Sequence, residues 1–184
     1  MFWQKLKDNW HPNECAEMKP NTSKMFYYKS KFEIAKFLQP KTICEIGVRA
    51  GYSAFSFLSA VPKAKYTGIE IDGNKHGGIK GFINHAEKIL KHFDIEIIIT
   101  DSQQLKKLPG QYDLIHIDGD HSYQGCKHDL ELSLHAGKYI LVDDYDLIPD
   151  VRGACEAFKI LHPELKYRYI SGRHGGNLLI KTFN

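Results

Sequence analysis

Acidic side chains and a histidine follow two short apolar runs in the second half of the chain. The run in YDLIHIDGDHSY leads to Asp118, Asp120 and His121, and the run in YILVDDY leads to Asp143 and Asp144. If the two runs are adjacent parallel strands, these side chains meet at one edge of a sheet. Carboxylates that lie so close repel one another unless a cation joins them. Because hard oxygen ligands select magnesium, manganese or calcium, we predict a divalent metal bound by Asp118, Asp143 and Asp144.

The same cluster contains two candidates for a catalytic base. An unperturbed histidine titrates near neutrality, so His121 is the first candidate and Asp120 the second. The alternative for His121 is a hydrogen-bonded loop histidine, and one of the aspartates is expected to cap a helix. His116, in the middle of its run, is predicted to be a core residue.

A second group of residues lies in the stretch ICEIGVRAGYSAF, residues 43 to 55. Gly47 and Gly51 follow a buried-looking run, where glycine permits positive φ and a close approach of the backbone to a ligand. Glu45 can accept hydrogen bonds from a ligand ammonium or hydroxyl group. Arg49 replaces the middle glycine of a dinucleotide fingerprint, which argues against a cradle for phosphate. The alternative is that the glycines only form a tight turn.

Polar side chains also end the next two apolar runs. GIEID contains Glu70 and Asp72, roughly 20 residues past the glycine turn, which is where an acid that binds a ribose diol is placed. TDSQQ contains Asp101, Ser102 and Gln103, whose carboxylate, hydroxyl and amide groups suit an adenine edge. A helix cap explains at least one of these three equally well. Together with the glycine turn, the two runs favour a nucleoside site over solvated strand ends.

These side chains need a sheet to position them. Short apolar runs with the length of strands covered on both faces are TICEIG, YTGIEID, IEIIIT, YDLIHID and KYILVDD. The stretches between them are long enough for crossover helices; they are YSAFSFLSAV, GGIKGFINHAEKILKHF, a shorter SQQLKKL, and SYQGCKHDLELSLHA. After residue 149 come a helix, DVRGACEAFKILH, and two runs, KYRYI and NLLIKTF, whose link SGRHGG is too short for a crossover. We predict an α/β fold with a Rossmann-like, mostly parallel sheet of seven strands, helices on both faces and an antiparallel C-terminal edge hairpin.

Composition limits the remaining possibilities. The chain has 184 residues with 42% hydrophobic content, which predicts one domain over residues 1–184, with residues 1–24 as an irregular arm or lid. Twenty-five basic and 22 acidic residues are spread along the chain, so we expect no nucleic-acid partner. The four cysteines are scattered and are predicted to be free thiols. The apolar runs are far below membrane length and the start lacks a signal-peptide core, which predicts a cytoplasmic protein without membrane attachment.

Five motifs, in this order and spacing, resemble one large family of enzymes. EIGVRAGYSA, GIEID, TDSQQ, HIDGDHSY and LVDDY resemble the class I S-adenosylmethionine-dependent methyltransferases. More narrowly, they resemble the metal-dependent O-methyltransferases, including the catechol and macrocin O-methyltransferase groups. The likeness covers roughly residues 25 to 145. It implies S-adenosylmethionine and a divalent metal, Mg²⁺ or else Mn²⁺ or Ca²⁺, as cofactors, and methyl transfer as the reaction.

The resemblance also implies roles for single residues. The methionyl part of the cofactor would lie at the glycine turn, the ribose at the end of the second run and the adenine at the end of the third. The cofactor-binding residues implied in this way are Glu45, Gly47, Gly51, Tyr52, Ser53, Glu70, Asp101, Ser102, Gln103 and Asp118. Asp118, Asp143 and Asp144 match the metal triad of that family, although the catechol enzymes have asparagine where this chain has Asp144.

The substrate expected from the resemblance is a hydroxyl on a small molecule or a sugar. His121 falls near the position of the catalytic lysine in the catechol enzymes, which favours the sugar-hydroxyl chemistry of the macrocin-like group. Arg173 and His174 are a further pair that could contact substrate, with a solvated turn as the alternative. The short N-terminal region leaves few residues for a substrate cap, so a partner subunit of a homo-oligomer is a candidate to complete the site.

Three other classes remain open at this stage. A nicotinamide-dependent oxidoreductase needs a pyrophosphate turn and gives no reason for the aspartate cluster. A non-catalytic regulator that binds S-adenosylmethionine would keep the glycine turn without needing a metal. An RNA methyltransferase would be expected to show a basic face or a base-flipping motif, and neither DPPY nor NPPY occurs in the chain.

Overall fold

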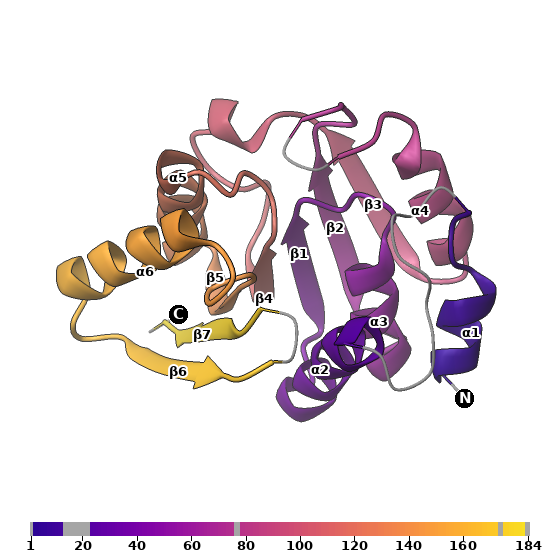
Figure 1. Ribbon diagram of the computed structural model, residues 1–184, viewed down its shortest axis with the longest axis horizontal. Helices are drawn as coiled ribbons and strands as arrows, with labels where there is room; N and C mark the ends of the chain where they lie inside the picture. Colours follow the sequence, from indigo (N-terminus) through magenta and orange to yellow (C-terminus); the bar gives the residue numbers. More distant parts are fainter. Residues whose placement is uncertain (1, 13–22, 76–77, 173–174, 183–184) are drawn as a thin grey trace.

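The computed structural model describes residues 2–12, 23–75, 78–172 and 175–182, and its strands form one mixed sheet (Figure 1). The sheet has seven strands in the order β3-β2-β1-β4-β5-β7-β6. Their bounds are β1 Thr42–Ile46, β2 Lys65–Glu70, β3 Asp94–Ile99, β4 Tyr112–Ile117, β5 Gly137–Val142, β6 Lys166–Ile170 and β7 Asn177–Lys181. The first five strands are parallel, and β7 is antiparallel to both β5 and β6. The predicted sheet and its antiparallel edge hairpin are confirmed.

Six α-helices lie among the described residues. They are α1 Phe2–Asp8, α2 Ser23–Leu38, α3 Tyr52–Ala60, α4 Phe82–Leu90, α5 Tyr123–Leu134 and α6 Pro149–Leu161. Helix α1 corrects the prediction that residues 1–24 are irregular: its Leu6 is buried, and Phe2 stacks on Phe32 with ring centroids 4.8 Å apart. The predicted helical stretch SQQLKKL shortens to a 3₁₀ turn, η1 Ser102–Gln104. No helix was predicted for the residues of α2.

The helices cover both faces of the sheet because successive strand side chains alternate between them. Ile43, Leu114 and Leu141 point to the core that α2, α3 and α4 contribute to. Cys44 and Ile115 point to the opposite core, with α5 and α6. Figure 1 shows the same division, with α5 and α6 on one side and α2, α3 and α4 on the other. The result is a three-layer α/β arrangement whose parallel strands are covered on both faces.

The order in which strands are added to the sheet reverses next to β1, and this places the site. From β1 the sheet continues to β2 and β3 on one side, and the chain then returns to add β4 and β5 on the other. In open parallel sheets, ligands bind at such a switch point, beyond the carboxyl ends of the strands. The loops after β1 and β4 are therefore the ones expected to form a site.

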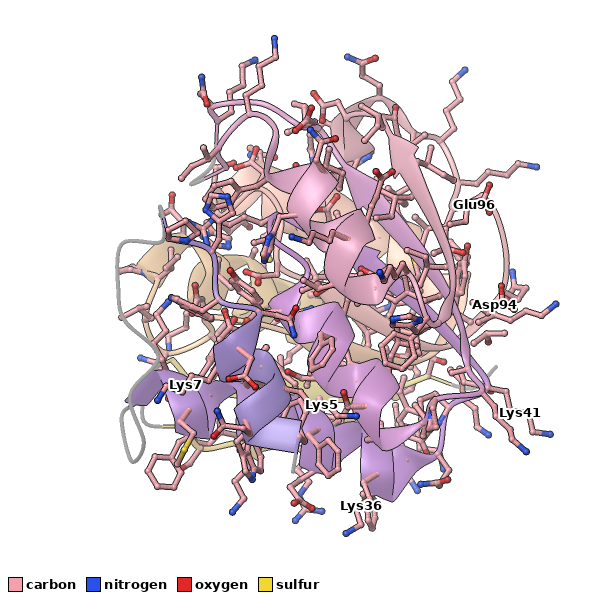
Figure 2. All side chains as sticks on the ribbon, turned by 90° about the vertical axis from the view of Figure 1, so that its right-hand side faces the viewer. Lys5, Lys7, Lys36, Lys41, Asp94 and Glu96 are labelled. Carbon is pink, nitrogen blue, oxygen red and sulfur yellow. The ribbon has the colours of Figure 1, made fainter. Side chains whose placement is uncertain are left out.

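Charged side chains are dispersed on the face covered by α1 and α4. Figure 2 shows Lys5, Lys7, Lys36 and Lys41 separated from one another, with Asp94 and Glu96 along the β3 edge. On this face the labelled basic groups do not form the continuous track that a nucleic-acid backbone requires. Across the described ranges, no helix has both the length and the apolar content needed to cross a bilayer.

Candidate active site

A pocket of about 260 Å³ opens at the carboxyl ends of β1, β2 and β4. It is lined from the glycine turn, the end of β2, the start of η1, the loop after β4 and helix α2. Predicted site residues that line it are Gly47, Tyr52, Ser53, Glu70, Asp101, Ser102, Asp118, Asp120, His121 and Asp144. Glu45, Gly51, Gln103 and Asp143 are not among the lining residues. The structure thus brings most of the predicted residues together at the switch point.

The two glycines of the turn have different tasks. Gly47 has φ +91°, and a Cβ there would lie 2.1 Å from the backbone oxygen of Asp118. Any side chain at Gly47 would therefore push apart the loops after β1 and β4, which together form the pocket floor. Gly51, with φ +78°, lies against α4, because a Cβ there would be 2.8 Å from Ala86 Cβ. Its role is packing at the start of α3.

Glu70 ties the glycine turn to the end of β2. Its Oε2 accepts hydrogen bonds from the backbone N–H groups of Val48, at 2.8 Å, and Arg49, at 2.6 Å. Its Oε1 accepts one from the N–H of Asp72, at 3.0 Å. The side chain lines the pocket at the position predicted for the ribose acid. Glu70 therefore shapes the loop that a ligand would contact, in addition to presenting its own oxygens.

The next loop offers only part of the predicted adenine edge. Asp101 caps η1 by accepting from the N–H of Gln103 at 3.0 Å, and both Asp101 and Ser102 line the pocket. The Gln103 side chain turns toward α5 instead, where its Nε2 donates to Asp129 Oδ1 at 3.1 Å. Asp129 is buried, and its burial raises its pKa to about 7. Gln103 thus connects η1 to α5.

Tyr52 is covered by the segment that follows α1. Its ring stacks on Trp10 with centroids 4.2 Å apart, and its hydroxyl oxygen accepts a hydrogen bond from the N–H of His11 at 2.7 Å. Ser53 follows it in the first turn of α3, and both residues line the pocket. The N-terminal segment therefore holds one pocket wall in place through Tyr52.

Asp118, His121 and Asp144 form the polar group that faces the pocket. Each offers a ligand atom, and these atoms lie within 4.8 Å of one another. His121 Nε2 donates to Asp118 Oδ1 at 3.1 Å, and this contact raises the pKa of His121 to about 9. Burial, with the charges of Asp143 and Asp118, raises the pKa of Asp144 to about 6. A carboxyl group that resists ionisation in this way fits a site that a hard divalent cation would complete.

Asp143 has different neighbours, although it too follows β5. Its side chain is buried, and its Oδ1 lies 2.8 Å from Nζ of Lys31, a fully buried lysine of α2. The hydroxyl of Tyr27 donates to Oδ2, and His116 Nε2 is 3.6 Å from the same oxygen. His116, Asp118 and Asp143 also have one ligand atom each within 4.8 Å of one another. The predicted triad is thus divided between the pocket surface and a layer behind it.

Glu45 belongs to that deeper layer. It is paired across the sheet with His116, and its Oε1 lies 2.8 Å from His116 Nδ1. The hydroxyl of Tyr66 donates to its other oxygen. Burial and the Lys31 charge act to lower the pKa of His116, but contacts with Asp143 and Glu45 outweigh them and raise it to about 9. The position of Glu45 in its strand is explained by this buried polar row, which passes behind the pocket.

Lys31 and Tyr27 are two residues of the site that the sequence analysis missed. Tyr27 lines the pocket, and its hydroxyl contacts two carboxylates: it donates to Asp143 and lies 3.5 Å from Asp118 Oδ2. A signal was present in α2, whose inward stripe of Tyr28, Ile34 and Ala35 includes Lys31 as its only charged member. A lysine in an apolar helical stripe is rarely buried without a partner, so it predicts an acid opposite. Arg173 and His174 lie outside the described residues.

Comparison with known proteins identifies the family. A family model described as a methyltransferase domain matches residues 44–145, just over half of the chain. The chain belongs to this methyltransferase domain family, and its fold is that of the class I S-adenosylmethionine-dependent methyltransferases. A comparison with curated protein sequences found no match.

Solved structures agree with the fold. The methyltransferase PaMTH1 of Podospora anserina, solved with SAH bound, aligns with a TM-score of 0.68 at 18% identity, over 100% of this chain and 86% of its own. The O-methyltransferase TomG of Streptomyces achromogenes, in complex with SAM, gives 0.68 at 15%, over 100% and 90%. An O-methyltransferase of Bacillus cereus in complex with SAH gives 0.66 at 16%, over 98% and 90%. At these identities the likeness is one of fold.

Proposed function

We propose that this chain is an S-adenosylmethionine-dependent O-methyltransferase that methylates a hydroxyl of a small molecule or sugar with the help of a divalent metal. The observation that carries the proposal is that one pocket contains two groups of residues. The Gly47 turn and Glu70 form the first group, and Asp118, His121 and Asp144 form the second. The first group suits a cofactor and the second suits activation of a hydroxyl. Two similar structures are O-methyltransferases, with SAM or SAH bound, which supports the same reaction.

The cofactor is proposed to lie along the pocket from the glycine turn to η1. Its methionyl part would lie by Gly47 and Ser53, its ribose by Glu70, and its adenine by Asp101 and Ser102, all of which line the pocket. Glu45, Gly51 and Gln103 stay predictions as direct contacts, because none of them lines the pocket. Their contacts support the residues that do line it.

Methyl transfer requires an acceptor oxygen behind the sulfonium methyl group. The oxygen attacks the methyl carbon, the C–S bond breaks, the sulfur keeps the electron pair and the acceptor gives up its proton. Two candidates to take that proton face the pocket, His121 and Asp120. Because the pKa of His121 is raised to about 9, the imidazole must first lose the proton that it donates to Asp118. In this structure His121 donates to Asp118, and Asp120 Oδ1 accepts from the N–H of Ser122 at 2.9 Å.

A divalent metal, when bound, supplies Lewis acidity that lowers the pKa of the acceptor hydroxyl. Asp118 and Asp144 present oxygen atoms to the pocket and are the best supported of the three predicted ligands. Mg²⁺, with Mn²⁺ or Ca²⁺ as substitutes, is proposed from the ligand chemistry. Asp143 is treated separately below because of its partner Lys31.

Two measurements test the proposed function. Calorimetric titration with S-adenosylhomocysteine and with NADH tests the cofactor, and binding of NADH alone would exclude the methyltransferase proposal. Turnover of methyl-labelled S-adenosylmethionine, screened with sugars and phenols in Mg²⁺, tests catalysis. Cofactor binding without methyl transfer to any acceptor would favour a regulator instead. A single domain, a cytoplasmic location and a homo-oligomer stay sequence-based predictions.

A further inference from the structure

Asp143 has a positively charged partner of its own inside the protein. Nζ of Lys31 lies 2.8 Å from Asp143 Oδ1 and donates to Asn177 Oδ1 at 2.5 Å. It also lies 4.6 Å from the centre of the Tyr27 ring. Lys31 and Asp143 both have side chains with 0% exposure, so no solvent screens the attraction between them. This ion pair is a fixed part of the interior rather than a surface contact.

Donors surround both oxygens of Asp143. Oδ1 accepts from Lys31 and from the backbone N–H of Asp144, at 3.0 Å. Oδ2 accepts from the Tyr27 hydroxyl and faces His116 Nε2 at 3.6 Å. A metal on either oxygen would have to displace one of these donors and lie close to the lysine charge. Both changes disfavour metal binding at Asp143.

Asp118 and Asp144 differ from Asp143 in their exposure to the pocket and in their charged partners. Both line the pocket, and neither has a lysine or arginine partner among the ion pairs of the described residues. A ring nitrogen of His121 is within 4.8 Å of an oxygen of each. The basic group beside these two residues is therefore the half-buried His121, which can itself offer a ligand atom, whereas the charge of Asp143 is compensated by a fully buried lysine.

We propose that Lys31 is the permanent counter-ion of Asp143 and withholds it from the metal, so that Asp118 and Asp144 are the acidic metal ligands of this pocket. The inference rests on the proposed metal-assisted function. Lys31 does not line the pocket. It is a positioning residue, which acts on the metal site through Asp143 and, one turn back along α2, through Tyr27.

The experiment measures Mn²⁺ affinity by electron paramagnetic resonance of the free ion, with no turnover required. The variants are Lys31→Met, the double variant Lys31→Met/Asp143→Asn, Asp118→Asn and Asp144→Asn. Removing both members of a buried pair leaves no uncompensated charge, so the double variant should bind Mn²⁺ within about three-fold of the wild type. Lys31→Met alone frees Asp143 and should tighten binding about ten-fold or more. Asp118→Asn and Asp144→Asn should each weaken binding by at least about ten-fold.

The controls separate metal affinity from folding and from the cofactor. Lys36→Met removes an exposed lysine of the same helix and should leave the Mn²⁺ affinity unchanged. Thermal unfolding of every variant shows which are folded, and the double variant keeps the test open if Lys31→Met alone does not fold. Titration with S-adenosylhomocysteine is independent of the metal, so its failure would count against the proposed function without deciding the role of Lys31.

Three results would overturn the inference. One is a double variant that loses as much Mn²⁺ affinity as Asp118→Asn, which would make Asp143 a ligand in the wild type. Another is a folded Lys31→Met variant that binds Mn²⁺ no more tightly than the wild type. The last is an absence of Mn²⁺ binding in all variants and the wild type.

Discussion

At the scale of single residues, the pocket depends on side chains that serve the fold and the ligand at once. Glu70 lines the pocket, yet both of its oxygens already accept hydrogen bonds from backbone N–H groups. Asp118 contributes a carboxylate, and its backbone oxygen fixes how closely Gly47 can approach. Substitutions at such positions change binding and stability together, so both must be measured.

Glu70→Ala tests the cofactor contact. We expect S-adenosylhomocysteine to bind more weakly by about 1 to 3 kcal/mol, because ligand and turn both lose a polar partner. Calorimetry gives the affinity, and urea unfolding gives the accompanying loss of stability. Glu87→Ala, at an exposed position of α4, is the matched control and should change neither. Unchanged affinity in a folded Glu70→Ala protein would remove Glu70 from the cofactor site.

Substitution of the two pocket bases separates their roles. If His121 accepts the proton, His121→Asn should lower kcat by roughly 10² to 10⁴, which is the usual contribution of general base catalysis. Asp120→Asn should then have a smaller effect. His135→Asn, at the exposed end of α5, is the control. The reverse order of the two effects would assign the proton to Asp120. Equal, small effects would leave neither residue as the base.

At the scale of elements, the sequence specified the strands better than the helices that cover them. Each run ending in an acid became a strand, because continuous apolar residues suit a sheet covered on both faces. Helix α2 was missed because Lys31 interrupts its apolar stripe. The burial of Lys31 depends on Asp143 and Asn177, which are far away in the sequence. The side chains of Gln103 and Glu45 contact Asp129 and His116 rather than the pocket. These partners belong to other elements, so the local sequence does not reveal the contacts.

The contact between η1 and α5 predicts a pH effect on stability. Asp129 is buried and its pKa is raised to about 7, so the folded state holds this proton more tightly than the unfolded state does. Its contribution to stability is complete below about pH 4 and is lost as the pH rises through about 7. Wild-type protein should therefore lose roughly 1 to 3 kcal/mol of unfolding free energy between pH 5 and 8 through this group.

Asp129→Asn should flatten that part of the pH profile, because the amide does not ionise. Urea unfolding at pH 5 and pH 8 measures the difference directly. Asp94→Asn, at an exposed position on the β3 edge, is the control and should keep the wild-type slope. An Asp129→Asn protein with the wild-type slope would show that another group causes the pH dependence.

At the scale of the whole molecule, the two halves of the pocket come from opposite sides of β1. The glycine turn, Glu70 and η1 belong to the side of β2 and β3, and the acidic group belongs to the side of β4 and β5. The halves meet where Gly47 approaches the backbone of Asp118. We therefore expect a ligand of one half to bind without the ligand of the other.

Removal of metal should affect the two halves of the pocket differently. Excess chelator should abolish methyl transfer, and Mg²⁺ or Mn²⁺ should restore it. The affinity for S-adenosylhomocysteine should largely survive, because its proposed contacts lie on the other half. Asp118→Asn should reduce turnover in the same way. Full activity in excess chelator, with no metal found by elemental analysis, would contradict the metal assignment.

The distance in sequence between Lys31 and Asn177 has a consequence for the order of events during synthesis. Lys31 is made early, but its partners Asp143, just after β5, and Asn177, on β7, emerge 112 and 146 residues later. Until then Lys31 has neither of the two partners that it has in the folded chain, so we expect α2 to settle fully on the sheet only late in synthesis. We therefore expect Tyr27 to close over the acidic group only after β7 has been made, so that translation sets when the pocket first exists.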